Sequence, residues 1–139
     1  MDEAAVVKYI RETFAGVETS EAWGCTFFFY DSERKFPFAT LANTDENDQF
    51  SDLNRPSVFR LNVGVSKATF QSLFGSHSED GYDFTAFDRI MPHPVYGKMY
   101  WVCVLNPGAE TFASVTPLLA EAYEQSVKRH AQPRPASES

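Results

Sequence analysis

The most informative segment of the sequence is residues 91–106, which reads MPHPVYGKMYWVCVLN. It begins with Pro-His-Pro, whose two prolines restrict the backbone. Residues 100–105 then combine aromatic and β-branched side chains, and the Asn-Pro-Gly that follows is typical of a turn. We therefore predict a strand at Lys98–Leu105, covered on both faces. Its side chains alternate between two sets, Tyr100, Val102 and Val104 on one face and Trp101, Cys103 and Leu105 on the other.

Three further segments have the composition of strands, at residues 25–30 (CTFFFY), 36–42 (FPFATLA) and 58–65 (VFRLNVGV). Alternation in the third predicts a core face made of Phe59, Leu61, Val63 and Val65. Its other face is expected to be partly wet or to line a groove, and it carries Val58, Arg60, Asn62 and Gly64. Residues 19–21 are predicted to form a loop and residues 31–35 a hairpin connection. The acidic residues 43–55 are predicted to form an exposed loop that only solvates the chain or flanks a site.

Apolar residues at helical spacing predict a first helix at Asp2–Phe14, with Asp2 as its N-cap. Ser66 is expected to cap a second helix at residues 67–74. The side chains of that helix expected to point inward are Phe70, Leu73 and Phe74. Residues 84–90 are expected to add one helical turn.

A last helix is predicted at Glu110–His130, either capped by Thr111 or beginning at Thr116-Pro117. The element order is then helix, three strands, short helix, strand and helix. This order predicts an α+β fold, in which N- and C-terminal helices pack on one face of an antiparallel sheet. Trp101 and Leu119 are expected to be buried between sheet and helix. The length of 139 residues favours one domain, at residues 1–131, followed by a disordered tail at residues 132–139.

The charge of the chain disfavours polyanionic partners. The formal net charge is −7, and the 12 Lys and Arg residues are scattered, whereas a nucleic-acid-binding protein presents a basic face. Anionic membranes are disfavoured for the same reason, and no segment reaches the roughly 20 apolar residues of a membrane span. The first ten residues, MDEAAVVKYI, lack the basic region of a signal peptide. We therefore expect a soluble cytoplasmic protein, either a monomer or a homodimer.

The two cysteines, Cys25 and Cys103, both lie in apolar, strand-like segments. We expect two buried thiols, and a disulfide between them is the alternative. The sequence contains no CxxC and no Cys/His pair at zinc spacing, so neither a metal nor a cofactor is predicted. It also contains no GxSxG, GxxxxGK[ST], GxGxxG or HExxH motif.

Polar and aromatic side chains suggest one candidate site. His93 lies between two prolines, and an imidazole held by a stiff loop suits acid–base chemistry or a structural hydrogen bond. Arg60 and Asn62 share a strand face and could bind a carboxylate or phosphate. Four aromatic residues, Trp23, Tyr96, Tyr100 and Trp101, could line an apolar pocket or simply fill the core. The predicted ligand-binding residues are Trp23, Arg60, Asn62, His93, Tyr96 and Tyr100.

Several of these segments resemble the MmcQ/YjbR family. They include EAWG at residues 21–24 before CTFFFY, Lys35 with its Phe-rich strand, RLNV at residues 60–63 and the Ala122-Tyr123 pair of the last helix. A second, more extensive similarity is to an actinobacterial family of unknown function that carries EAWG, FRLNVGVSKATF, MPHPVYG and YWVCVLNP. The MmcQ/YjbR resemblance implies a frataxin-like (CyaY-like) fold, and either DNA binding or a role in secondary metabolism and drug resistance.

Three functional hypotheses follow from the sequence. The first is a non-catalytic module that binds a small aromatic molecule or a partner, linked to secondary metabolism or drug resistance by the resemblance. The second is an enzyme that uses His93 as general acid or base on a small aromatic substrate, assisted by Tyr96 or Arg60. The third is a DNA-associated protein, which the net charge disfavours.

Overall fold

The fold is organised around one antiparallel sheet. A computed structural model describes residues 1–31, 36–75 and 81–131 of the chain. Its sheet has six strands in the order β1-β2-β3-β4-β6-β5. The strands are β1 (Val17–Ala22), β2 (Cys25–Tyr30), β3 (Ala39–Ala42), β4 (Arg60–Gly64), β5 (Met91–Pro92) and β6 (Trp101–Leu105). The helices are α1 (Glu3–Thr13), α2 (Lys67–Phe74) and α3 (Ala109–Ala131), with a 3-10 turn η1 (Gly97–Met99).

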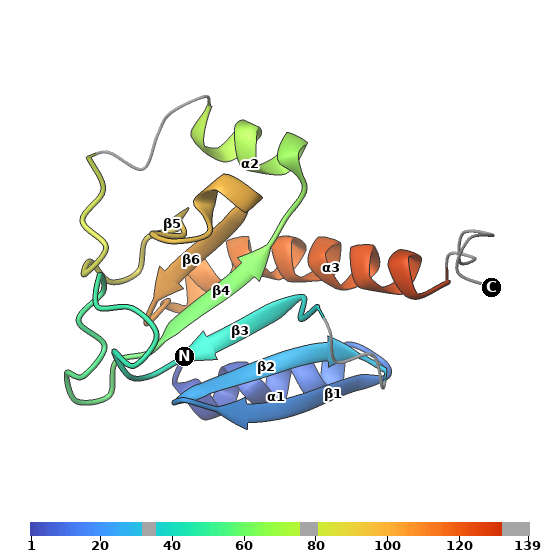
Figure 1. Ribbon diagram of the computed structural model, residues 1–139, viewed down its shortest axis with the longest axis horizontal. Helices are drawn as coiled ribbons and strands as arrows, with labels where there is room; N and C mark the ends of the chain where they lie inside the picture. The colour runs from blue at the N-terminus through green and yellow to red at the C-terminus, as the bar shows by residue number, and fades with distance from the viewer. Residues whose placement is uncertain (32–35, 76–80, 132–139) are drawn as a thin grey trace.

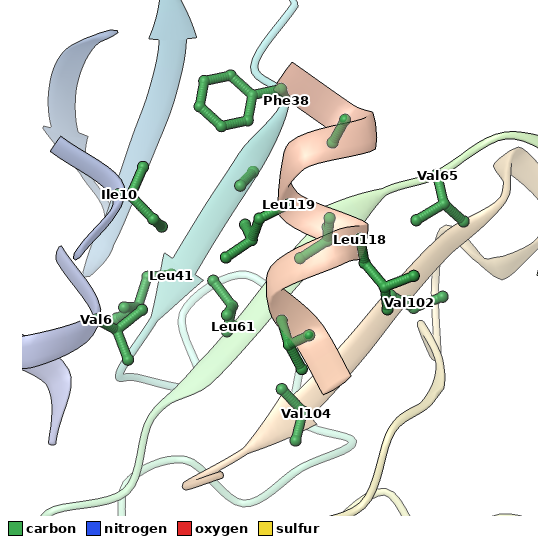
Figure 2. Close-up of a cluster of buried hydrophobic side chains, with 14 of the residues drawn as sticks. Val6, Ile10, Phe38, Leu41, Leu61, Val65, Val102, Val104, Leu118 and Leu119 are labelled. Atoms are coloured by element: carbon green, nitrogen blue, oxygen red, sulfur yellow. The ribbon is translucent and has the colours of Figure 1, made fainter. Parts of the chain in front are cut away.

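Both terminal helices cover the same face of the sheet, as the sequence predicted. Figure 1 shows α1 behind β1 and β2, and α3 behind β4 and β6. Figure 2 shows side chains of α3, among them Leu119, meeting Leu61 of β4, while Ile10 of α1 approaches Leu41 of β3. These four side chains are at most 1% exposed, which makes this layer the main core. The α+β fold is therefore confirmed.

The alternation predicted for β4 and β6 is also confirmed. Val102 and Val104 lie in the core under the helices, whereas Cys103 and Leu105 belong to a smaller apolar cluster on the opposite face. That face is covered by loops and by the β5 segment rather than by a helix, with Leu53 and Met91 buried against it. The cover is incomplete, and the exposed remainder of the face carries the candidate site.

The prediction of a loop at residues 19–21 is wrong, because these residues belong to β1. The sequence VETSEA lacks apolar alternation, but all six of its residues pair with β2, from Val17 opposite Tyr30 to Ala22 opposite Cys25. A two-residue turn joins the strands, with φ of 52° at Trp23 and 67° at Gly24. Positive φ at both central residues is the type I′ pattern whose twist suits a hairpin.

The strand predicted at residues 98–105 begins only at Trp101. Gly97–Met99 forms the 3-10 turn, and Tyr100 follows in the left-handed conformation with φ of 66°. No helical turn forms at residues 84–90; Phe87 instead makes an isolated bridge to Leu105. The segment therefore begins with one turn, closed by a hydrogen bond from the Ala86 N–H to the Asp83 carbonyl at 3.1 Å, and then runs beside the end of β6.

The last helix is confirmed, because α3 (Ala109–Ala131) exceeds the predicted Glu110–His130 by one residue at each end. Neither Thr111 nor Thr116-Pro117 opens it, because α3 starts at Ala109 and Pro117 lies inside it. Proline has no N–H to donate to the carbonyl four residues earlier, which belongs to Ala113. The Thr116 hydroxyl donates to that Ala113 oxygen at 2.9 Å, which satisfies the acceptor and lets the helix continue.

The caps predicted for the first two helices are confirmed. The Asp2 side chain accepts a hydrogen bond from the Ala5 N–H, and the Ser66 side chain accepts one from the Thr69 N–H. In α2, Phe70 and Phe74 are buried, but Leu73 is 42% exposed and the inward orientation predicted for it is wrong. The hairpin connection at residues 32–35, part of the loop at 76–83 and the tail at 132–139 lie outside the described residues.

Candidate functional site

A pocket of about 660 Å³ occupies the side of the sheet opposite α1 and continues past the start of β3 to the last turns of α3. Its floor is formed by strand residues whose side chains share one face. Register places Phe27, Thr40 and Asn62 in one row across β2, β3 and β4. The adjacent row contains Cys25, Ala42 and Arg60. Neighbouring positions in an antiparallel sheet lie about 5 Å apart, so polar groups in these rows are within hydrogen-bonding reach of one another.

Arg60 is the centre of this floor and is only 2% exposed. Its Nη1 donates to Asp48 Oδ1 at 3.0 Å, and its Nη2 donates to Asp48 Oδ2 at 2.6 Å. Nη1 also donates to Ser51 Oγ at 2.9 Å, and Nε donates to Asn62 Oδ1 at 2.9 Å. Asn62 in turn donates from Nδ2 to Thr40 Oγ1 at 3.0 Å. A buried guanidinium is stable only with such compensation, and here a carboxylate and two neutral acceptors provide it.

The loop at residues 43–55 flanks the site, which is the second of the two roles predicted for it, but the prediction that it is exposed throughout is wrong. Ser51 and Leu53 are at most 1% exposed, and the Asp48 side chain is 9% exposed. Asp45 Oδ1 accepts a hydrogen bond from the Leu53 N–H at 2.7 Å, which closes the loop on itself. Burial of the Asp48 carboxyl raises its pKa, but the hydrogen bonds and charge of Arg60 outweigh this effect, and the pKa lies below its ordinary value. The loop therefore holds a buried anion against the sheet.

His93 is held by the backbone of its own turn. Its Nδ1 accepts hydrogen bonds from the N–H groups of Val95 and Tyr96, both at 3.0 Å. The ring thus caps the turn that Pro94 begins, which is the structural hydrogen bond considered from the sequence. Burial and then the charge of Arg60 lower the pKa of His93 to about 3, although Asp48 acts in the opposite direction. The ring is neutral at physiological pH, and because Nδ1 is an acceptor, its proton is on Nε2.

The pocket walls are aromatic. Trp101 lies over Gly64, its partner on β4, because a Cβ there would be 2.9–3.2 Å from three atoms of the indole. Trp101 therefore lines the pocket, and the prediction that it is buried between sheet and helix is wrong. The Tyr96 ring lies 5.1 Å from the imidazole of His93. Trp23 stands at the rim with 69% of its surface exposed. Such a combination of flat apolar walls and a polar floor is typical of small-molecule sites.

Both cysteines are free and buried, as expected, and the alternative of a disulfide between them is wrong. Cys25 is on β2 and Cys103 on β6, with β3 and β4 between them. Three strand spacings amount to about 14 Å, well beyond the span of a disulfide. Burial raises the pKa of Cys103 to about 12 and also raises the pKa of Cys25, which lies in the pocket floor.

The sequence of this chain matches one family model over residues 1–135. The chain belongs to DUF6194, a family of unknown function. Its fold is similar to the crystal structure of a protein from Pseudomonas syringae, a target of the Northeast Structural Genomics Consortium, with a TM-score of 0.58 at 16% sequence identity. That similarity covers 91% of this chain and 99% of the other, and it supports the fold alone. No curated protein matches the chain.

Five of the six ligand-binding residues predicted for this DUF6194 protein line the pocket: Trp23, Arg60, Asn62, His93 and Tyr96. The sixth, Tyr100, packs instead beside the main core, with its ring 5.7 Å from that of Phe70. Within the described part of the chain, no helix is long and apolar enough to cross a membrane. Among the same residues, no group of three or more His, Cys, Asp and Glu is placed to hold a metal ion.

The sequence analysis did not identify the loop residues that accept hydrogen bonds from Arg60. Asp48 and Ser51 lie 12 and 9 positions before it, within a segment that looked like ordinary polar loop. One signal was available: an arginine in the middle of an apolar strand needs a carboxylate partner, and the nearest acidic cluster is that loop. The position of Thr40 was also predictable from strand pairing, once the register of β3 and β4 was known.

Proposed function

We propose that this protein is a non-catalytic module that binds a small aromatic molecule in the pocket above β3 and β4. One observation carries the proposal: a pocket of about 660 Å³ combines aromatic walls with a buried and fully organised polar floor. Pockets that bind small molecules typically have volumes of about 300–1,000 Å³ and a few convergent polar groups among apolar ones. The resemblance to MmcQ/YjbR proteins extends the proposal to metabolites and antibiotics of secondary metabolism.

The floor is organised before any ligand arrives. Four donor contacts hold the Arg60 guanidinium, and two backbone N–H groups hold the His93 ring. Side chains fixed in this way lose little conformational entropy when a ligand binds, so more of the contact energy appears as affinity. A site of this construction suits recognition.

The geometry favours binding over acid–base catalysis. A general base needs a lone pair that faces the substrate, but the lone pair of His93 Nδ1 is directed at the backbone of residues 95 and 96. Its Nε2 carries the proton and can only donate. The lowered pKa of about 3 further disfavours proton uptake at neutral pH.

The protein contains its own reporter of pocket occupancy. Its two tryptophans, Trp23 and Trp101, both line the pocket, so tryptophan fluorescence should respond to a bound ligand. We propose to screen naphthalene, quinoline, acridine and anthraquinone derivatives, together with aromatic antibiotics. Saturable quenching should accompany a rise in Tm, because a ligand at 100 times its Kd stabilises by about 2.7 kcal/mol.

Two exposed aromatic residues provide a matched pair of variants. Trp23 is 69% exposed at the pocket rim, and Phe50 is 57% exposed but does not line the pocket. Trp23→Ala should weaken binding about tenfold while Phe50→Ala leaves it unchanged, measured by calorimetry. The proposal is rejected if no compound binds saturably, or if the two variants bind alike.

A further inference from the structure

We infer that the pocket selects ligands that present an uncharged oxygen acceptor, such as an aromatic ketone or amide, over the corresponding carboxylates. The inference rests on the proposed function and specifies the ligand class. It starts from the hydrogen atoms of Arg60 and His93, both of which line the pocket.

Arg60 uses most of its donors within the protein. Of its five N–H groups, one contacts Asn62, one contacts Ser51 and two contact the Asp48 carboxylate. The fifth is on Nη2, which lies 3.5 Å from His93 Nε2. Asp48 therefore occupies the pair of Arg60 donors, on Nη1 and Nη2, that could have bound a ligand carboxylate in bidentate fashion. The sequence analysis considered Arg60 as a binder of such a ligand carboxylate or phosphate.

Whether the 3.5 Å contact between Arg60 Nη2 and His93 Nε2 is a hydrogen bond depends on which ring nitrogen carries the proton. His93 Nδ1 accepts from two backbone N–H groups, so Nε2 carries the proton of the neutral ring. With the proton on Nε2, two donors lie 3.5 Å apart at the pocket. A carbonyl oxygen has two lone pairs, and one oxygen about 2.9 Å from each nitrogen can accept from both.

The local charge determines which oxygen fits. The carboxylate of Asp48, 2.6 Å from Nη2, already neutralises Arg60 in a region that water barely reaches. A ligand carboxylate here would be a second buried anion with only one cation, and leaving such a charge without its own partner is costly. A ketone or amide oxygen takes the same two hydrogen bonds without that cost.

Among the described residues that line the pocket, one other is a cation, Arg129, which is exposed and lies 5.6 Å from the Phe36 ring. Strand register separates it from Arg60: β4 pairs Arg60 with Ala42 at one end of β3, whereas Phe36 precedes the other end. An exposed cation attracts anions weakly and in a salt-dependent way. Arg129→Gln therefore removes the competing attraction for a carboxylate that the described lining of the pocket provides.

The test compares three probes of nearly equal shape, 2-acetonaphthone, 2-naphthamide and 2-naphthoate, by isothermal titration calorimetry. For wild type and Arg129→Gln we expect the ketone and the amide to bind at least tenfold more tightly than the carboxylate. Asp48→Asn exposes the charge of Arg60 and should reduce or reverse this preference, measured at a temperature where circular dichroism shows the variant folded.

The outcomes separate the two proposals. If 2-naphthoate binds Arg129→Gln as tightly as the amide does, the inference is wrong while the proposed function stands. If none of the three probes binds wild type saturably, both are rejected. The wild-type and Arg129→Gln comparison decides the inference even if Asp48→Asn does not fold.

Discussion

The substitution Asp48→Asn tests whether the loop at residues 43–55 is held to the sheet by charge. It keeps the size of the side chain and one acceptor oxygen but removes the negative charge beside Arg60. The two side chains are 9% and 3% exposed, and their closest atoms are 2.6 Å apart. Removing one partner of a buried pair leaves an uncompensated charge and typically costs about 3–5 kcal/mol. Because Asn retains an acceptor and Ser51 still accepts from Nη1, we expect a loss of about 3 kcal/mol.

The same loop provides the control. Asp52 pairs with Arg55 at 3.5 Å, but the two side chains are 60% and 33% exposed. Exposed ion pairs contribute about 0–1 kcal/mol, so Asp52→Asn should change the free energy of unfolding by less than about 1 kcal/mol. Urea denaturation followed by circular dichroism at pH 7 measures both variants. If Asp48→Asn costs no more than Asp52→Asn, Arg60 does not depend on Asp48 and the account of the floor is wrong.

Three further perturbations test other parts of the structure. The pKa of His93 is lowered from 6.5 to about 3, so the imidazole takes up a proton in the unfolded chain at a higher pH than in the folded protein. Between about pH 6 and 4, each unit by which the pH falls should therefore lower the free energy of unfolding by about 1.4 kcal/mol through His93. Urea denaturation across this pH range should show that the free energy of unfolding falls less steeply with falling pH in His93→Asn than in the wild type. Gly64→Ala should displace the indole of Trp101, shift its fluorescence maximum and narrow the pocket; an unchanged spectrum would contradict the packing described. Leu119→Ala, at a fully buried site, should cost about 2–5 kcal/mol, whereas Leu73→Ala, 42% exposed, should cost about 1 kcal/mol or less, and equal losses would refute the core assignment.

The sequence was sufficient to predict the layers of the fold because periodicity reports burial. The alternation of β4 and β6 and the helical spacing of apolar residues in α1 each follow from which side chains avoid water. β1 was missed because it is an edge strand whose stability comes from backbone pairing with β2, and VETSEA carries no apolar alternation. The alternative start of α3 at Thr116-Pro117 was wrong because the cost of Pro117 inside the helix depends on whether the Ala113 carbonyl finds another donor, which Thr116 supplies.

The candidate site was predictable only in part, for a related physical reason. Arg60 and Asn62 stand out as polar residues on an apolar strand, and His93 stands out between its prolines. Asp48, the partner of Arg60, does not stand out in the sequence, because a carboxylate in a polar loop has the same sequence context whether it faces water or a guanidinium. Which way it faces depends on how residues 43–55 fold back on the sheet, and that depends on contacts such as Leu53 N–H to Asp45 that no periodicity records.

The stability of the fold and the shape of the pocket both depend on the side chain of Arg60. Asp48 and Ser51 of the long loop contact one edge of the Arg60 guanidinium, and the capped ring of His93 lies beside another. Any change in the charge of this group therefore acts on the loop and on the pocket floor together. A ligand that accepts from Arg60 and His93 strengthens the same arrangement that holds the loop down. Binding should consequently raise the free energy of unfolding and slow local opening of residues 43–55, which hydrogen exchange would detect as added protection at the Leu53 amide.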